Sequence, residues 1–214
     1  MLVKDVMTSN PVTVQMTTSV NDLQSLMKKH DIDTVPVTDK QGALVGLITK
    51  ADLRKSTPSD ATSLDMFELS YLLSKLTVEK VMIKSVKTTT ENTAVEEAAR
   101  LLEDYNISCL PVVKNGLVIG IVTKNDLFRS FIDMFGTRHA GVRATFTVED
   151  KPGVLNTFTE KLAKLKGNIV SLVTADVSET GRRRVTIRVT DVNLSQMEDL
   201  IKECSGILED IRNV

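Results

Sequence analysis

The chain of 214 residues contains few of the residues from which nucleic-acid sites are built. Aromatic residues make up only 4% and tryptophan is absent, which disfavours an aromatic platform for single-stranded nucleic acid. The formal net charge is −1, and neither the part before residue 136 nor the part after it has the basic excess that phosphate-backbone binding requires. We therefore expect no nucleic acid among the partners of this protein.

Cysteine and histidine are equally scarce, with two of each. Cys109 and Cys204 lie far apart and no CxxC pair occurs, so the spacing of a metal site is missing and we expect no metal. Both cysteines lie next to apolar residues, which predicts buried, reduced thiols in a cytoplasmic protein. His30, at the end of a predicted helix, and His139, in a predicted joint, have no catalytic context. We therefore predict no catalytic residues and no enzyme activity.

Long apolar segments are also missing. No apolar run approaches the roughly 18 residues of a membrane span, and residues 1–7 lack the apolar core of a signal peptide. We therefore expect no membrane partner.

The chain does contain an internal repeat. Residues 3–40 align with 78–115, and residues 42–56 align with 116–130, with 17 identities in 53 pairs. Each copy opens with Val-x-x-Val-Met, and a short extended piece near Thr13 or Thr88 follows. Such self-similarity indicates two copies of one structural unit.

The periodicity of each copy predicts the order β-α-β-β-α. We expect helices over 20–30 and 95–105, strands over 34–38, 43–48, 109–113 and 117–122, and final helices that open at Thr49 and Thr123. One copy buries little surface alone. We therefore expect the two copies to pack sheet to sheet about a pseudo-twofold axis, which brings equivalent loops together.

The remaining segments complete an α+β (α/β sandwich) architecture. Ser63 is a candidate cap for a linking helix that is apolar nearly all round. After residue 136, the order β-α-β-β-α-β predicts a ferredoxin-like sandwich, in which Pro152 lies in the first turn of a helix and Gly167 stops it. The expected domains are repeat 1 (1–57), the linking helix (58–77), repeat 2 (78–136) and the C-terminal domain (137–214).

One polar motif, Gly-φ-φ-Thr-Lys-x-Asp, occurs in both repeats. Glycine at the start of a strand leaves room for a planar group near the backbone. Threonine at a helix N-terminus offers a hydroxyl where the helix dipole attracts phosphate, and aspartate one turn later can accept hydrogen bonds from a ribose diol. The lysines add candidate phosphate contacts, and Arg54 and Arg129 lie one helical turn further on. The candidate ligand residues are Gly46, Thr49, Lys50, Asp52, Gly120, Thr123, Lys124 and Asp126.

A purely structural interpretation of this motif stays open. Thr-x-x-Asp resembles a capping box, which stabilises a helix by about 1 kcal/mol without any ligand. Duplication copies helix caps as readily as binding sites, so the recurrence of the motif does not decide between the two.

Three motifs that occur twice in register resemble tandem CBS domains. They are Val-x-x-Val-Met, Ile-x-x-x-Pro-Val (32–37 and 107–112) and Gly-φ-φ-Thr-x-x-Asp-Leu. The resemblance covers residues 3–135 and implies a Bateman module, whose clefts between repeats often bind adenine nucleotides or S-adenosylmethionine. It also implies that Thr49, Asp52, Thr123 and Asp126 contact phosphate or ribose.

Residues 140–214 resemble an ACT domain through Asp-Lys-Pro-Gly-Val-Leu (150–155) and Gly-Asn-Ile (167–169). The resemblance implies dimerisation or small-molecule binding, with Asp150, Pro152, Gly153 and Asn168 as candidate ligand residues. The serine-binding pattern of that family, His-x-Asn-x-Pro-Gly, lacks its histidine here, and Asp150 replaces its asparagine. Residues Arg182, Arg183 and Arg184 follow a predicted turn, where a solvated strand edge and an anion or partner patch are the alternatives.

The order CBS–CBS–ACT resembles the acetoin-utilisation B family. That resemblance implies an accessory or regulatory protein. Our leading hypothesis is a non-enzymatic regulatory sensor that binds AMP, ADP, ATP or S-adenosylmethionine, forms a homodimer and acts on an unknown regulated protein. Two alternatives are a structural oligomerisation adaptor with empty clefts and an amino-acid sensor that uses the ACT domain.

Overall fold

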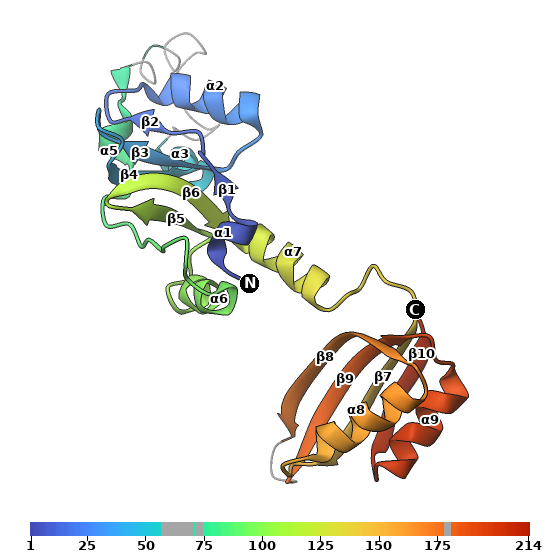
Figure 1. Cartoon of the computed structure of the whole chain (residues 1–214). Helices are drawn as coiled ribbons and strands as arrows, with labels where there is room; N and C mark the ends of the chain where they lie inside the picture. The colour runs from blue at the N-terminus through green and yellow to red at the C-terminus, as the bar shows by residue number, and fades with distance from the viewer. Residues whose placement is uncertain (57–70, 72–74, 178–180) are drawn as a thin grey trace. The chain divides into compact units, whose positions relative to one another are not determined.

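A computed structural model describes residues 1–56, 71, 75–177 and 181–214, which form two compact units, Met1–Leu127 and Phe128–Val214 (Figure 1). Helices and strands are mixed in both units, as the α+β class requires. The helix predicted over 58–77, with its cap at Ser63, lies outside the described residues apart from its last few positions.

The first repeat follows the predicted order. Its elements are α1 (Val3–Val6), β1 (Thr8–Ser9), β2 (Val14–Gln15), α2 (Val20–His30), β3 (Thr34–Thr38), β4 (Leu44–Thr49) and α3 (Lys50–Ser56). The second repeat has α5 (Val78–Val81), α6 (Val95–Asp104), β5 (Cys109–Lys114), β6 (Leu117–Thr123) and α7 (Lys124–Met134). The apolar faces predicted for the two long helices are buried, with relative exposures of 4% or less at Val20, Leu23, Met27, Val95, Ala98 and Leu102.

Each repeat holds the opening segment of the other. In the first segment, the Val3 amide donates to the Thr93 carbonyl (2.8 Å), and β1 pairs with β6 (Figure 1). In the second, the Val78 amide donates to the Thr18 carbonyl (2.9 Å), and Ile83 forms a bridge with Leu47 of β4. The sheet of the second repeat, β1-β6-β5, therefore includes a strand from the first repeat. The sheet of the first repeat, β2-β3-β4, is extended by the bridge at Ile83 of the second.

Equivalent turns of the two repeats meet, as predicted. The Leu44 amide donates to the Gly116 carbonyl (3.2 Å), and the Val118 amide donates to the Gly42 carbonyl (3.3 Å). Both glycines have a left-handed backbone, with φ of 85° at Gly42 and 82° at Gly116, which a side chain would strain. The two hydrogen bonds are related by the repeat, so the contact has the expected pseudo-twofold symmetry.

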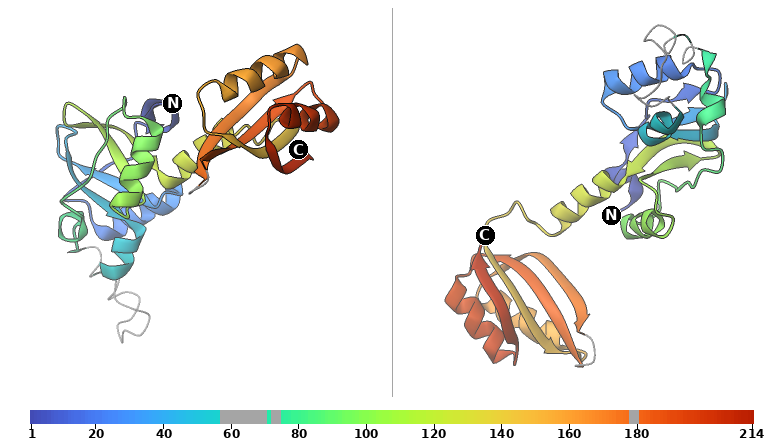
Figure 2. Two further views of the ribbon diagram at one scale, coloured as in Figure 1. Left: turned by 90° about the horizontal axis from the view of Figure 1, so that it is seen from below. Right: turned by 180° about the vertical axis from the view of Figure 1, so that it is seen from behind.

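The second unit is a four-stranded antiparallel sheet with two helices. Its elements are β7 (Val142–Glu149), α8 (Val154–Lys164), β8 (Asn168–Val177), β9 (Arg182–Thr190), α9 (Leu194–Glu203) and β10 (Ile207–Asn213), in the sheet order β10-β7-β9-β8. Phe146 of β7 and Phe158 of α8 stack at 5.0 Å between ring centroids, inside a core that both helices share with the sheet. The right-hand view of Figure 2 turns the other, helix-free face of this sheet toward the reader.

Two details of α8 differ from the prediction. Helix α8 begins at Val154 with Gly153 (φ 88°) as its N-cap, so Pro152 precedes the helix and does not lie in its first turn. At the other end, Lys166 adopts the left-handed backbone (φ 62°) expected of Gly167. Gly167 serves close packing instead, because a Cβ atom there would lie 2.5 Å from Cδ1 of Leu162.

The two cysteines are free thiols. Cys109 is buried between the repeats, against Leu47 and Ile121, whereas Cys204 is only partly buried. Burial raises the pKa of the Cys109 thiol, while hydrogen bonds with the side chains of Thr34 and Ser108 act to lower it. Thr34 is the repeat equivalent of Cys109, so the two side chains meet across the pseudo-twofold axis.

We predict that Thr89→Val stabilises the protein. The Thr89 hydroxyl is buried, and no hydrogen-bond partner for it occurs in the described part of the chain. The equivalent residue of the first repeat is Val14, which is also buried. Replacing the hydroxyl with a methyl group should raise the free energy of unfolding by about 1–2 kcal/mol, measured by urea denaturation. The same change at exposed Thr88 should alter it by less than about 0.5 kcal/mol, and a loss of stability in Thr89→Val would contradict the assignment.

Candidate functional site

The duplicated motif forms the same closed cap at the start of both final helices. In the first repeat, the Thr49 hydroxyl donates to Oδ2 of Asp52 (2.6 Å), and the Asp52 amide donates to the Thr49 hydroxyl (3.2 Å). In the second, the corresponding distances between Thr123 and Asp126 are 2.7 Å and 3.3 Å. The prediction that the motif caps both helices is therefore confirmed. The caps form without a ligand, and they do not decide whether the motif also binds one.

The cap leaves acceptor capacity at the second site. Within the described chain, the hydrogen bonds of the Asp126 carboxylate involve Oδ2, which accepts from the Thr123 amide (2.9 Å) and the Thr123 hydroxyl. The Oδ1 atom can therefore accept from a ligand hydroxyl while the cap stays intact. Both motif residues are only partly buried, so a solute can approach them.

The role expected for Gly46 and Gly120 needs correction. Both lie inside a strand, not at its start, and the space beside each is filled by a methionine side chain. A Cβ atom on Gly46 would lie 2.5 Å from Sδ of Met82, and one on Gly120 would collide with Sδ of Met7. These glycines therefore admit the methionine of the other repeat's Val-x-x-Val-Met segment, and the planar ligand group expected there has no room.

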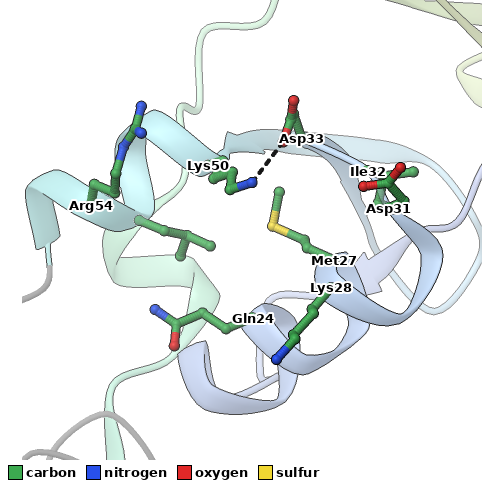
Figure 3. Close-up of a pocket in the computed structure, with 9 residues that line it drawn as sticks. Gln24, Met27, Lys28, Asp31, Ile32, Asp33, Lys50 and Arg54 are labelled. Carbon is green, nitrogen blue, oxygen red and sulfur yellow. Dashed lines mark ion pairs between the residues drawn. The ribbon is translucent and has the colours of Figure 1, made fainter.

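The basic residues of the first repeat's motif region line a different surface from the threonine–aspartate cap. Lys50 and Arg54 line a groove of about 450 Å³ between α2 and α3, whose lining does not include Thr49 or Asp52 (Figure 3). The Lys50 amine points to Asp33, with a distance of 3.3 Å between Nζ and Oδ1. Lys28 gives the groove a third basic side chain. Lys124, the repeat equivalent of Lys50, and Arg129, which follows the second motif, are exposed.

A hollow that the sequence did not indicate lies where the repeats meet. It has a volume of about 260 Å³ and is lined by Leu44 and Val45 of β4, by residues of the 84–88 segment, and by Val113 and Gly116. Its walls come from both repeats because the 84–88 segment continues from the bridge between Ile83 and Leu47. Strand β4 leads directly from this hollow to Thr49.

The C-terminal candidates are only partly brought together. Asp150, Pro152 and Gly153 line a hollow of about 290 Å³, whereas Asn168 lies at the opposite end of the unit, at the start of β8. Arg183 holds Asp150 through two hydrogen bonds, Nε to Oδ1 (2.9 Å) and Nη2 to Oδ2 (3.2 Å). The hydrogen bond from Arg183 lowers the pKa of Asp150 below its ordinary value.

The edge interpretation of the three arginines is wrong. Strand β9 is an interior strand, paired with β7 and β8 from Arg182 onward. Arg182 donates to the Thr147 hydroxyl (3.0 Å), and Arg184 donates to Glu209 (2.7 Å). These side chains therefore link neighbouring strands or the adjoining loop and do not protect an exposed edge.

Other sites are not seen in the described residues. No cluster of three or more candidate metal ligands occurs among them, and none of their helices is long and apolar enough to cross a bilayer. His30 ends α2 and is exposed, and His139 is exposed in the segment between α7 and β7.

Family models match both parts of the chain. The CBS domain model matches residues 3–58 and 78–133, which together exceed half of the chain, and the TTHA0829-like ACT domain model matches residues 140–212. The chain therefore belongs to the CBS domain family and has a CBS pair followed by an ACT domain. CBS and ACT domains are regulatory and typically non-catalytic.

The solved structures show what the CBS pair is similar to. A putative acetoin utilization protein (AcuB) from Vibrio cholerae is 28% identical, covers 64% of this chain and 95% of its own, and has a TM-score of 0.54. The CBS pair of protein MJ0100, solved with 5′-methylthioadenosine and S-adenosyl-L-methionine, is 33% identical over 61% of this chain and 99% of its own, with a TM-score of 0.51. CBSX2, solved with AMP, is 34% identical over 61% and 96%, with a TM-score of 0.51.

Curated relatives are similar over the CBS part. The L-aspartate semialdehyde sulfurtransferase of Methanocaldococcus jannaschii is 34% identical over 131 residues, which are 61% of this chain and 23% of that protein. The CBS domain-containing protein YhcV of Bacillus subtilis is 30% identical over 58% of this chain and 81% of its own. The chain spans less than a quarter of the length of the first curated relatives that it matches.

We predict that Arg183→Gln raises the pKa of Asp150 toward its ordinary value. With Arg183 present, the depressed folded-state pKa contributes stability above the unfolded pKa, and this contribution is lost as the pH falls through the folded pKa. A carboxyl-carbon NMR titration of wild type and variant measures the change. Asp210, whose pKa is lowered mainly by Arg212, is the internal control and should titrate unchanged. An unaltered Asp150 titration in the variant would show that Arg183 is not the cause.

Proposed function

We propose that the protein is a non-enzymatic regulatory sensor whose CBS pair binds an adenine nucleotide or another adenosyl ligand. The candidate ligands are AMP, ADP, ATP and S-adenosylmethionine. The observation that carries the proposal is the pair of symmetry-related Thr-x-x-Asp caps, at Thr49–Asp52 and Thr123–Asp126, in a fold whose similar CBS pairs were solved with AMP, 5′-methylthioadenosine and S-adenosyl-L-methionine.

The residues suit different parts of such a ligand. A ribose diol donates to the aspartate, for which Oδ1 of Asp126 has capacity, and a phosphate lies near the amides at the helix N-terminus. The adenine fits the apolar surface between the repeats, of which Leu44, Val45 and Val86 are a part. Because that surface is built from both repeats, a ligand on it would favour one packing of the pair over others.

Helix α7 offers a way to transmit the change. Asp126 lies in its first turn, whereas its residues from Phe128 onward belong to the second unit. A ligand held by Asp126 would therefore act on a helix that continues into the second unit. In this proposal the ACT domain dimerises or binds a small molecule, and a cytoplasmic partner protein responds to the change.

A structural adaptor is the second candidate. The closed caps favour it, because they account for Thr49, Asp52, Thr123 and Asp126 without any ligand. An adaptor would lose helix stability when these aspartates are replaced, but it would show no affinity for adenosyl compounds.

An amino-acid sensor is the third candidate, and the ion pair of Asp150 with Arg183 beside the Pro-Gly turn is the observation that favours it. An amino acid offers an ammonium group to Asp150 and a carboxylate to Arg183. A screen of amino acids against the full chain by thermal shift separates this candidate from the first, because only the third predicts a shift that Asp150→Ala abolishes.

We predict that adenosyl ligands bind with affinities that depend on the two motif aspartates. Asp52→Ala and Asp126→Ala should each remove hydrogen bonds to a charged acceptor and weaken binding at their own site by about 10- to 150-fold, or 1.5–3 kcal/mol. Isothermal titration calorimetry with AMP, ADP, ATP and S-adenosylmethionine measures the change and separates the sites.

The matched control is Asp22→Ala. Asp22 forms the same kind of cap with Ser19 on α2, with its amide donating to the Ser19 hydroxyl (3.0 Å), but it is not part of the duplicated motif. The control should lose a similar helix stability and keep its affinity. If none of the four compounds gives heat or a thermal shift, the adaptor replaces the sensor; if Asp22→Ala weakens binding equally, helix capping and not ligand contact explains the aspartates.

A further inference from the structure

The helix-free face of the ACT sheet carries a buried arginine. Strand β9 is central there, and its Arg188 is flanked by Arg143 of β7 and Ser171 of β8, while Thr186 is flanked by Val173 on the β8 side. Arg188 is only 8% exposed, although α8 and α9 lie on the other face of the sheet (Figure 2). Its burial comes from the segment that follows α7.

That segment folds over one end of the sheet. The Ser171 hydroxyl donates to the Phe135 carbonyl (2.9 Å), and Nη1 of Arg188 donates to the His139 carbonyl (2.6 Å). Between the segment and the strands remains a cavity of about 320 Å³, lined by Phe135 and Thr137 of the segment and by residues of β7, β8 and β9, Arg188 among them. The cavity lies wholly within the second unit.

The charge of Arg188 has no counterion in the described part of the chain. The neighbouring Arg143, by contrast, pairs with Asp210 (2.8 Å between Nη1 and Oδ2). No acidic residue lines the cavity. Burying nine-tenths of a guanidinium with no carboxylate beside it costs folding free energy unless an anion pairs with its charge. Its hydrogen bonds to described residues involve Nη1 alone, so Nε and Nη2 remain for a bidentate acceptor.

The other residues that line the cavity indicate what the rest of the ligand is like. Phe135 is 43% exposed and Val173 is 38% exposed, and both line the cavity. The hydroxyls of Thr137, Ser171 and Thr186 lie on residues of the same lining. A small molecule with one carboxylate and a short apolar body matches this combination.

We propose that this cavity binds a small aliphatic carboxylate, with its carboxylate on the guanidinium of Arg188 and its apolar part against Phe135 and Val173. The site is separate from the Pro-Gly hollow, whose Arg183 lies five residues away along β9 and is paired with Asp150. It does not depend on adenosyl binding by the CBS pair. Phe135 and Thr137 belong to the segment between α7 and β7, so a ligand here contacts that segment as well as the sheet.

Isovalerate is the probe, and isovaleramide, which has the same shape without the charge, is its control. Titrated into the full-length protein up to about 50 mM, isovalerate should shift the backbone NMR signals of Ser171, Val173 and Thr186 and saturate. Isovaleramide should bind at least about tenfold more weakly, because it cannot pair with the guanidinium. Absence of a saturable shift at these residues, or equal binding of acid and amide, would overturn the proposal. The first of these outcomes is the one expected if a second copy of the chain covers Arg188.

Arg188→Gln and Arg184→Gln form the matched pair of variants. Arg184 alternates onto the same face of β9 but pairs with Glu209 outside the cavity. Arg188→Gln should weaken isovalerate binding at least about tenfold, and Arg184→Gln by less than about twofold. Equal affinity of wild type and Arg188→Gln would sink the assignment. The comparison of acid with amide on the wild-type chain decides the matter if Arg188→Gln fails to fold.

Discussion

The CBS unit depends on backbone hydrogen bonds that each repeat makes with the opening segment of the other. The Leu47 amide donates to the Ile83 carbonyl (2.9 Å), and the Ile83 amide donates to the Leu47 carbonyl (2.8 Å). Thr8 pairs with Ile121 at the equivalent place in the other repeat. Val3 and Val78, at the start of these segments, are fully buried. Neither repeat therefore has a complete core by itself, and the hollow lined by Leu44, Val86 and Val113 exists only in the pair.

The same exchange of segments explains why several positions of the duplicated motif each require a particular type of residue. Gly46 and Gly120 accommodate the methionines of the exchanged segments, and the threonine–aspartate pairs cap the helices that follow. Every one of these residues has a structural task before any ligand is considered. Ligand affinity must therefore come from hydrogen-bonding groups that these structural contacts do not use, such as Oδ1 of Asp126. It does not come from residues that serve binding alone.

Local periodicity was enough to predict most of the fold. The observed bounds of α2 and β3 are those expected from the sequence, because amphipathic spacing and cap residues act over a few neighbours. The exchange of segments was not predictable, since strand pairing between distant residues leaves no local pattern. The same holds for the methionine beside each glycine and for Arg188, whose burial depends on a loop that folds over a sheet. The caps of the candidate site were foreseen, but it was not foreseen that the groove lined by Lys50 excludes Thr49 and Asp52, because the groove depends on how α2 packs beside α3.

Helix α7 is where the two proposed sites could influence each other. Asp126 lies in its first turn, and Phe135, directly after its last residue, lines the cavity of Arg188. Eleven residues of helix span about 16 Å. Coupling would nevertheless require that each ligand prefer one state of this connection, because affinity that is equal in both states shifts no equilibrium. Both ligands would have to favour the same position of the covering segment, residues 135–139. That segment is held to the sheet by hydrogen bonds that include those of Ser171 and Arg188.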